Sequence, residues 1–182
     1  MKRLLLFASS LLMMVSASAQ KLIDGSLDRL VDARYVLVTW DFSETKFENS
    51  FMDEETWIYK SNSSLKEWDQ DTKPEVLEAF VSKANRELSQ SPITLTDEDM
   101  SHTTRFVMVI APQRLHRNGN NQTLYLFRDM ERNGEIFAVV KLSTMGGRIG
   151  SLTNLLSDGY KEAGELMGSY LRKKLNKIYR RR

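Results

Sequence analysis

The segment 104–142, TRFVMVIAPQRLHRNGNNQTLYLFRDMERNGEIFAVVKL, contains three apolar runs separated by polar turns. The runs, at 104–111, 123–128 and 135–142, are rich in β-branched and aromatic residues that alternate as in strands. Asn133-Gly134, between the last two runs, is a pair favoured in hairpins because both residues tolerate positive φ. The segment therefore predicts an antiparallel meander of three strands.

The residues before the meander predict a strand, a helix and a short edge strand. Residues 34–42 alternate with a period of two, with apolar side chains on both faces. Pro74 favours the first turn of a helix, where its missing N–H costs nothing, and apolar residues at helical spacing continue to about Ser89. Residues 93–96 predict the edge strand.

A long amphipathic helix is expected after the meander, capped by Ser151 and continuing to Ile178. Leaving the short edge strand aside, the order β-α-β-β-β-α then predicts an α+β fold with one mixed, mostly antiparallel sheet and two helices packed on one face. If the first strand pairs in parallel with a later one, the first helix makes the crossover between them. We expect a single domain over 20–182, with a lead-in or short helix at 20–33 and an irregular insert at 43–72.

Residues 1–19 have the composition of a secretory signal. Lys2 and Arg3 precede the apolar run 4–15, and Ala17-Ser18-Ala19 supplies small residues for cleavage before Gln20. The run is shorter than the ~20 residues that cross a bilayer, and nothing after it approaches that length. We therefore expect no transmembrane segment, and a product that is periplasmic or secreted.

The chain contains no cysteine, which excludes disulfides, thiolate metal sites and the acylated cysteine of a lipoprotein. Its charge is uneven, because residues 171–182 carry basic side chains and no acid. We expect this region to be a solvated helix end, whose cations favour the helix dipole. Weak contact of Arg172–Arg182 with an anionic envelope surface is the alternative, and nucleic acid is not an expected partner of an exported chain.

The loop Gly146-Gly147-Arg148-Ile149-Gly150 lies between a strand and a helix start, where anions can bind. Gly147, Gly150 and Ser151 are the weak candidates there. The Gly-Lys-Ser/Thr of a phosphate loop is missing, and no strand follows the last helix, so a tight structural connection is favoured. His102 and His116 have no metal-ligand spacing, and we expect no metal, no cofactor and no catalytic triad.

The insert is the best candidate ligand site, because Trp57, Tyr59 and Trp68 lie there among many carboxylates. Aromatic faces beside acids are typical of sugar-binding surfaces, and a carboxylate pair is the machinery of glycoside hydrolysis. The favoured interpretation is structural, with the tryptophans pinning the insert to the core.

Gly164 and Gly168 lie four residues apart on the last helix. Each costs ~1 kcal/mol of helix propensity relative to alanine, so close packing must compensate. Packing against the chain's own sheet is favoured, and a homodimer through this helix is the alternative.

The C-terminal half resembles a group of small uncharacterised secreted proteins of Bacteroidota. The likeness covers roughly 34–178 and is carried by short motifs: Glu135-Ile-Phe-Ala-Val-Val-Lys-Leu142, Gly146-Gly147, Gly150, Gly159-Tyr160-Lys161-Glu162-Ala163-Gly164, Gly168, Leu171-Arg-Lys-Lys-Leu175, and Phe80 to Asn85 followed by Leu88. It implies an exported α+β domain and brings no catalytic residue. The element order is also similar to the periplasmic domain of the curli-secretion lipoprotein and to TolB amino-terminal domains, which implies envelope assembly by fold analogy alone.

These patterns favour a non-enzymatic, exported binding or assembly module of the bacterial envelope. Its partner would be an envelope protein or a glycan. The alternative is a carbohydrate-binding or carbohydrate-active protein that uses the aromatic and acidic insert.

Overall fold

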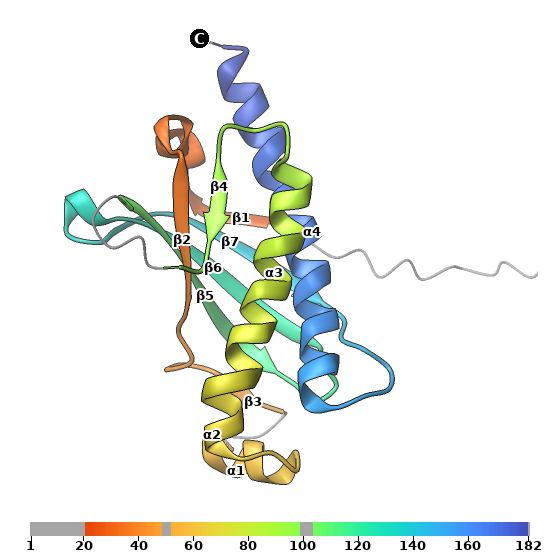
Figure 1. Cartoon of the computed structure of the whole chain (residues 1–182). Helices are drawn as coiled ribbons and strands as arrows, with labels where there is room; N and C mark the ends of the chain where they lie inside the picture. The colour runs from red at the N-terminus through yellow and green to blue at the C-terminus, as the bar shows by residue number, and fades with distance from the viewer. Residues whose placement is uncertain (1–20, 49–51, 99–103, 182) are drawn as a thin grey trace, which may run out of the picture.

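The computed structural model describes residues 21–48, 52–98 and 104–181. The expected signal at 1–19, its cleavage site and His102 lie outside these residues. The described chain forms a seven-stranded mixed sheet in the order β1-β7-β6-β5-β2-β4, with β3 paired to β5. Helices α3 (Lys73–Leu88) and α4 (Leu152–Tyr179) lie side by side on one face of this sheet (Figure 1). The predicted α+β fold, with both long helices on one face, is confirmed.

The meander is present as predicted, with longer strands. Strands β5, β6 and β7 pair in antiparallel order, and β2 lies parallel to both β5 and β4. Asn133 and Gly134 both adopt the positive φ that the hairpin requires, at 55° and 72°. The strands span β1 (Lys21–Gly25), β2 (Tyr35–Trp40), β3 (Lys46–Phe47), β4 (Thr94–Thr96), β5 (Phe106–Leu115), β6 (Asn121–Asp129) and β7 (Glu135–Thr144).

The prediction of a lead-in or short helix at 20–33 missed a strand. Residues Lys21–Gly25 form β1 at the edge of the sheet, antiparallel to β7, and a 3-10 turn at Leu27–Asp32 follows it. A bulge at Ile23 interrupts the pairing, so the apolar positions of this strand do not alternate regularly. The period-two signal is therefore too weak to identify the strand from sequence.

The insert at 43–72 is also more regular than predicted. It contains β3, helix α1 (Glu54–Lys60), the short helix α2 (Leu65–Glu67) and a π-helical turn at Trp68–Thr72 that continues into α3. Asp53 and Ser64 cap α1 and α2, because their side chains accept hydrogen bonds from the backbone N–H of Thr56 and Glu67. These caps were the missed sequence signal.

A chain of aromatic rings ties the insert to the sheet and to α4. Successive ring centroids in this chain lie 4.9–5.6 Å apart. The insert chain runs Phe47, Trp57, Trp68, Phe42, Trp40 and Tyr160. The insert therefore belongs to the same hydrophobic core as the sheet and the helices.

The glycines of α4 pack against a helix, which corrects the expectation that they contact the sheet. A Cβ at Gly164 would lie 2.3 Å from the Phe80 carbonyl oxygen, and one at Gly168 would lie 2.4 Å from that of Ala84. Both contacts are with α3, so the two helices approach each other more closely than larger residues would permit. Gly164 and Gly168 therefore pack against α3 of the same chain and are not available for a dimer contact through α4.

None of the helices in the described ranges combines the length and hydrophobicity needed to cross a bilayer.

Candidate functional site

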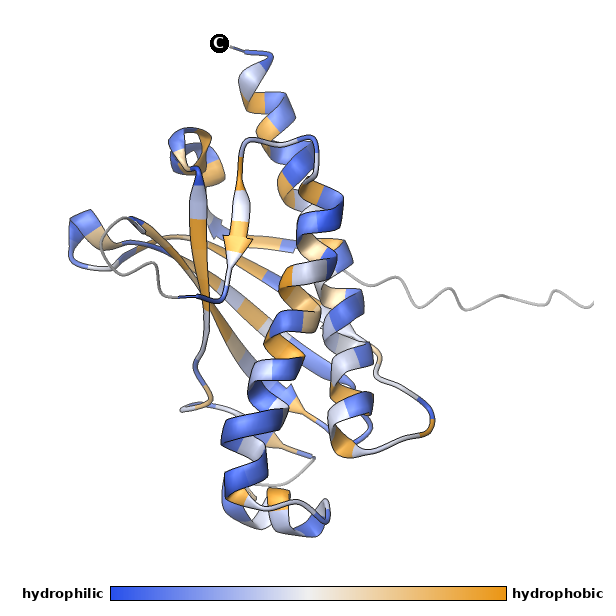
Figure 2. Cartoon of the chain, in the orientation of Figure 1, coloured by the Kyte–Doolittle hydropathy of each residue, from blue (hydrophilic) through white to orange (hydrophobic). Residues whose placement is uncertain are grey.

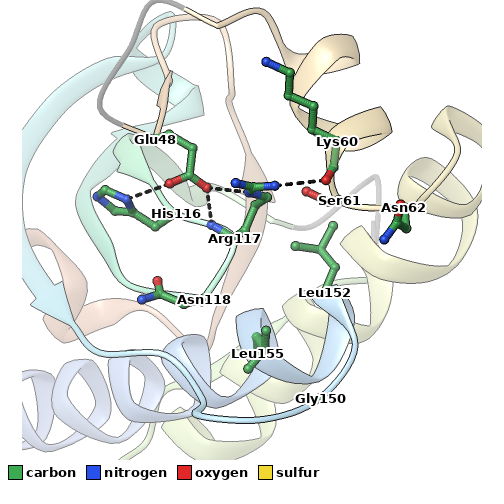
Figure 3. Close-up of a pocket in the computed structure, with 10 residues that line it drawn as sticks. All are labelled: Glu48, Lys60, Ser61, Asn62, His116, Arg117, Asn118, Gly150, Leu152 and Leu155. Carbon is green, nitrogen blue, oxygen red and sulfur yellow. Dashed lines mark hydrogen bonds and ion pairs between the residues drawn. The ribbon is translucent and has the colours of Figure 1, made fainter.

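A polar cleft of about 480 Å³ opens at the end of the molecule where three segments converge. One wall comes from the insert, a second from the loop between β5 and β6, and the floor from the start of α4 (Figure 3). Its volume lies within the ~300–1,000 Å³ typical of small-molecule sites. The lining residues are Glu48, Lys60, Ser61, Asn62, His116, Arg117, Asn118, Gly150, Leu152 and Leu155.

The Glu48 carboxylate holds the two walls together. Its Oε1 accepts from the backbone N–H of Arg117 at 2.8 Å, from Arg117 Nε at 3.1 Å and from Trp57 Nε1 at 3.2 Å. Its Oε2 lies 3.1 Å from Nδ1 of His116. The insert is therefore fixed to the β5–β6 loop through one half-buried carboxylate.

Arg117 is held from behind and leaves one nitrogen available. Its Nε donates to Glu48 and its Nη1 donates to the Lys60 carbonyl oxygen at 2.9 Å, so the guanidinium lies between these two groups (Figure 3). Nη2 makes no hydrogen bond or ion pair with any residue of the described ranges. The Lys60 side chain points away from Arg117 (Figure 3), so Arg117 is the cation that the cleft presents.

Backbone strain also concentrates at this cleft. Three non-glycine residues have positive φ in the described part of the chain, and two of them, Glu48 at 57° and Asn62 at 58°, line the cleft. A left-handed conformation at a residue such as Glu costs of order 1–3 kcal/mol and persists only where the surroundings enforce it. Such strain is typical of binding and catalytic sites.

The pKa of Glu48 lies below its ordinary value of 4.5. Burial by itself raises this pKa, but hydrogen bonds from the Arg117 backbone, His116, Trp57 and the Arg117 guanidinium together outweigh burial. A carboxyl with a lowered pKa in the folded state stabilises the fold above its unfolded-state pKa, and this contribution is lost as pH falls through the folded-state pKa.

We therefore expect Glu48→Gln to lower the free energy of unfolding by about 1–3 kcal/mol near pH 7, because the charge-assisted hydrogen bonds are weakened. Urea unfolding of both proteins between about pH 3 and pH 7 checks this, and the difference should shrink below about pH 4.5. A difference that stays constant across this range would show that the Glu48 charge does not stabilise the fold.

The aromatic residues predicted as ligand contacts in the insert differ in their exposure to solvent. Trp57 and Trp68 are 0% and 2% exposed and lie in the core, as the packing interpretation requires, so neither presents a face to a sugar. Tyr59 is 79% exposed on α1 and does not line the cleft. Of the three candidate aromatic residues, Tyr59 is the one that remains available to contact a glycan, and glycan binding by Tyr59 stays a prediction.

The candidate anion loop supplies one residue to the cleft. Gly150 lines it, whereas Ser151 caps α4 by accepting a hydrogen bond from the Asn154 N–H at 3.3 Å. Gly147 donates its N–H to the Leu155 carbonyl, and a Cβ there would lie 2.7 Å from the Asp158 carboxylate. That carboxylate disfavours an anion at Gly147, and anion binding by this loop stays a prediction.

The basic C-terminal region forms the exposed end of α4 (Figure 1). Arg172 pairs with Glu87 of α3 at 3.3 Å, while Lys173, Lys177 and Arg181 are exposed. This arrangement is that of a solvated helix end. Contact of Arg172–Arg182 with an anionic surface stays a prediction, and Arg182 lies outside the described residues.

No cluster of three or more potential metal ligands occurs within the residues that the structure places. His116 is engaged with Glu48, and its ring nitrogen Nδ1 makes that contact.

The sequence predicts a site in the insert, but it does not identify most of the residues that line the cleft. Glu48, Asn62, Arg117 and Asn118 carry no spacing motif, and they meet only through the tertiary fold. The available signal was the polar His116-Arg117-Asn118 step at a strand end, directly before the tight turn at Gly119, whose φ is 82°.

Comparisons with known proteins find distant structural likenesses only. No protein-family model and no curated protein matches the sequence. The PelC dodecamer from Paraburkholderia phytofirmans is similar with a TM-score of 0.39 and 12% identity, over 83% of this chain and 98% of that one. A variant of that PelC gives 0.41 and 11%, over 85% and 96%. An uncharacterised protein gives 0.41 and 8%, over 75% and 90%. Likenesses of this size identify no family.

Proposed function

We propose that this chain is an exported, non-enzymatic binding module of the bacterial envelope, and that its ligand is an acidic glycan held in the cleft at Arg117. The observation that carries the proposal is the guanidinium of Arg117, fixed from behind by Glu48 and by the Lys60 carbonyl, with Nη2 unpaired among the described residues. A preorganised guanidinium is suited to a carboxylate, because little side-chain entropy is lost on binding.

The remaining lining residues fit the rest of a sugar. Ser61, Asn62 and Asn118 bring hydroxyl and amide groups that exchange hydrogen bonds with sugar hydroxyls. Leu152 and Leu155 form an apolar floor for the C–H face of a ring. The first turn of α4 adds the positive end of a long helix dipole, which favours a negatively charged ligand.

A binding role is favoured over glycoside hydrolysis by the state of the cleft's acid. Hydrolysis requires two carboxyl groups across a scissile bond, one of them with a raised pKa. Glu48 is the one carboxylate among the lining residues, its pKa is lowered, and its oxygens are engaged by protein donors. An acid in this state positions Arg117 and does not donate a proton.

We expect Arg117→Met to weaken binding of an oligogalacturonate by about 10- to 150-fold, which corresponds to a lost charge-assisted hydrogen bond of about 1.5–3 kcal/mol. Isothermal titration calorimetry on the folded variants measures this. Arg148→Met is the matched control, because Arg148 is exposed and does not line the cleft.

Asn62→Asp is a second variant that separates binding from folding. Aspartate tolerates the left-handed conformation of Asn62, so the variant should remain folded. The added negative charge should weaken binding of the acidic glycan in the cleft. Equal binding by wild type, Arg117→Met and Asn62→Asp would exclude the cleft. Loss of binding in Tyr59→Ala instead would move the site to the exposed face of α1.

A further inference from the structure

No helix of the described chain covers the face of the sheet opposite α3 and α4 (Figure 1). Tyr125 of β6 stacks on Phe80 of α3 with ring centroids 5.5 Å apart, so Tyr125 points toward the helices. Side chains alternate along a strand, and Leu124 and Leu126 therefore point to the opposite face. The strand register then identifies their neighbours on that open face.

The open face is apolar across four strands. Leu126 lies between Val109 and Val139, and Val107 lies between Leu37 and Arg128. Figure 2 shows hydrophobic residues along the strands, with hydrophilic residues between them. An antiparallel sheet with one face in water normally alternates apolar and polar residues, so apolar residues on both faces indicate that something covers the second one. The open apolar face is formed mainly by five partly exposed residues around the buried Val109: Leu37, Val107, Leu124, Leu126 and Val139.

Of the charged residues on this face, which include Lys21 and Arg128, Lys141 and Asp41 lie at equal distances from its middle. One cross-strand row runs from Lys141 on β7 through Leu124 and Ala111 to Asp41. Asp41 directly follows β2, and its backbone N–H donates to the Ile110 carbonyl of β5 at 2.9 Å, which places it beside Ala111. Lys141 and Asp41 therefore lie one strand outside the β5–β6 boundary, on opposite sides.

The other charged groups near Asp41 are consistent with this position. Its Oδ1 accepts from the Ser43 N–H at 3.0 Å, and the charge of Arg128, on the same face, reaches it. Lys141 makes no ion pair with any residue in the described ranges. The row continues past Lys141 to its register partner Lys21 on the edge strand β1, so one side of the row carries two lysines. The other side carries the Asp41 carboxylate, which has spare acceptor positions.

We infer that the open sheet face is a dimer interface with a second copy of this chain, related by a two-fold axis along the β5–β6 boundary. This axis lies in the plane between the two sheets and places Lys141 of each copy opposite Asp41 of the other. The apolar rows between them then pack sheet on sheet, and the two copies gain two symmetric ion pairs. The inference does not depend on the ligand in the cleft, because the cleft is lined by residues of the insert, of the loop that follows β5 and of the start of α4, and not by the residues of the open face.

Sedimentation velocity of the exported chain, with charge-swapped variants, tests the inference. The wild type should sediment as a dimer. Lys141→Asp and Asp41→Lys should each weaken dimerisation by about tenfold or more, because like charges then face each other. The double swap should restore it, since each copy again presents one charge of each sign.

Two further variants provide a disrupting change and a control for the dimer test. Leu126→Asp should give a folded monomer, because it places a carboxylate at the centre of the apolar rows. Circular dichroism checks that this variant is folded. Lys66→Asp, an exposed change on α2, should leave the dimer intact. A monomeric wild type, a dimer unaffected by Leu126→Asp, or a double swap that stays as weak as either single change would each overturn the inference.

Discussion

Replacing Trp57 with alanine is expected to lower the free energy of unfolding by about 3–5 kcal/mol, the usual cost of emptying a buried tryptophan site. Trp57 is fully buried, its ring packs between Phe47 and Trp68, and its Nε1 donates to Glu48. The substitution removes a link in the aromatic chain and one of the hydrogen bonds that fix Glu48. Urea unfolding followed by circular dichroism measures the effect.

Tyr59→Ala is the matched control for this prediction. Tyr59 lies on the same helix, two residues further on, and is 79% exposed, so its loss should change the unfolding free energy by less than about 0.5 kcal/mol. If Trp57→Ala proved as stable as Tyr59→Ala while glycan binding disappeared, Trp57 would be a ligand residue and its place in the core would be wrong.

Gly164→Leu should destabilise the protein by about 3 kcal/mol or more. A Cβ at this position would meet the backbone carbonyl of Phe80 at 2.3 Å, and a backbone atom cannot move aside as a flexible side chain can. Helices α3 and α4 would have to separate, which exposes the buried residues between them. The gain of about 1 kcal/mol in helix propensity relative to glycine is too small to compensate.

Glu165→Leu provides the comparison for this second change. It introduces the same side chain at the next, exposed position of α4 and should be nearly neutral. Thermal unfolding of the two variants separates them. A Gly164→Leu protein as stable as Glu165→Leu, but no longer dimeric, would assign Gly164 to an interface between chains and contradict the packing of α4 on α3.

The fold was largely predictable because its long elements have strong periodic signals. The meander, the strand before it and both long helices were predicted from period-two and helical spacing, and Ser151 was correctly identified as the cap of α4. The misses are elements whose stability comes from tertiary contacts. β1 is short and bulged, and the helices of the insert are held by caps and by Trp57 and Trp68 packing inward.

The cleft was not predictable from spacing, because its residues come from three segments that the fold alone brings together. Glu48 and Arg117 are far apart in sequence, and neither belongs to a motif. The aromatic composition indicated the correct segment, the insert. However, the tryptophans that drew attention to it, Trp57 and Trp68, are buried in the core and do not line the cleft. The glycine pair of α4 shows the same limit, since sequence indicates a close approach without identifying the element approached.

The most direct test of the proposed function is a titration of the isotopically labelled protein with oligogalacturonate, followed by backbone amide chemical shifts. We predict saturable shift changes concentrated at 60–62, 116–118 and 150–155, the segments that supply lining residues of the cleft, and their loss in Arg117→Met. Shift changes confined to α1 around Tyr59 or to the basic end of α4, with the cleft amides unmoved, would contradict it.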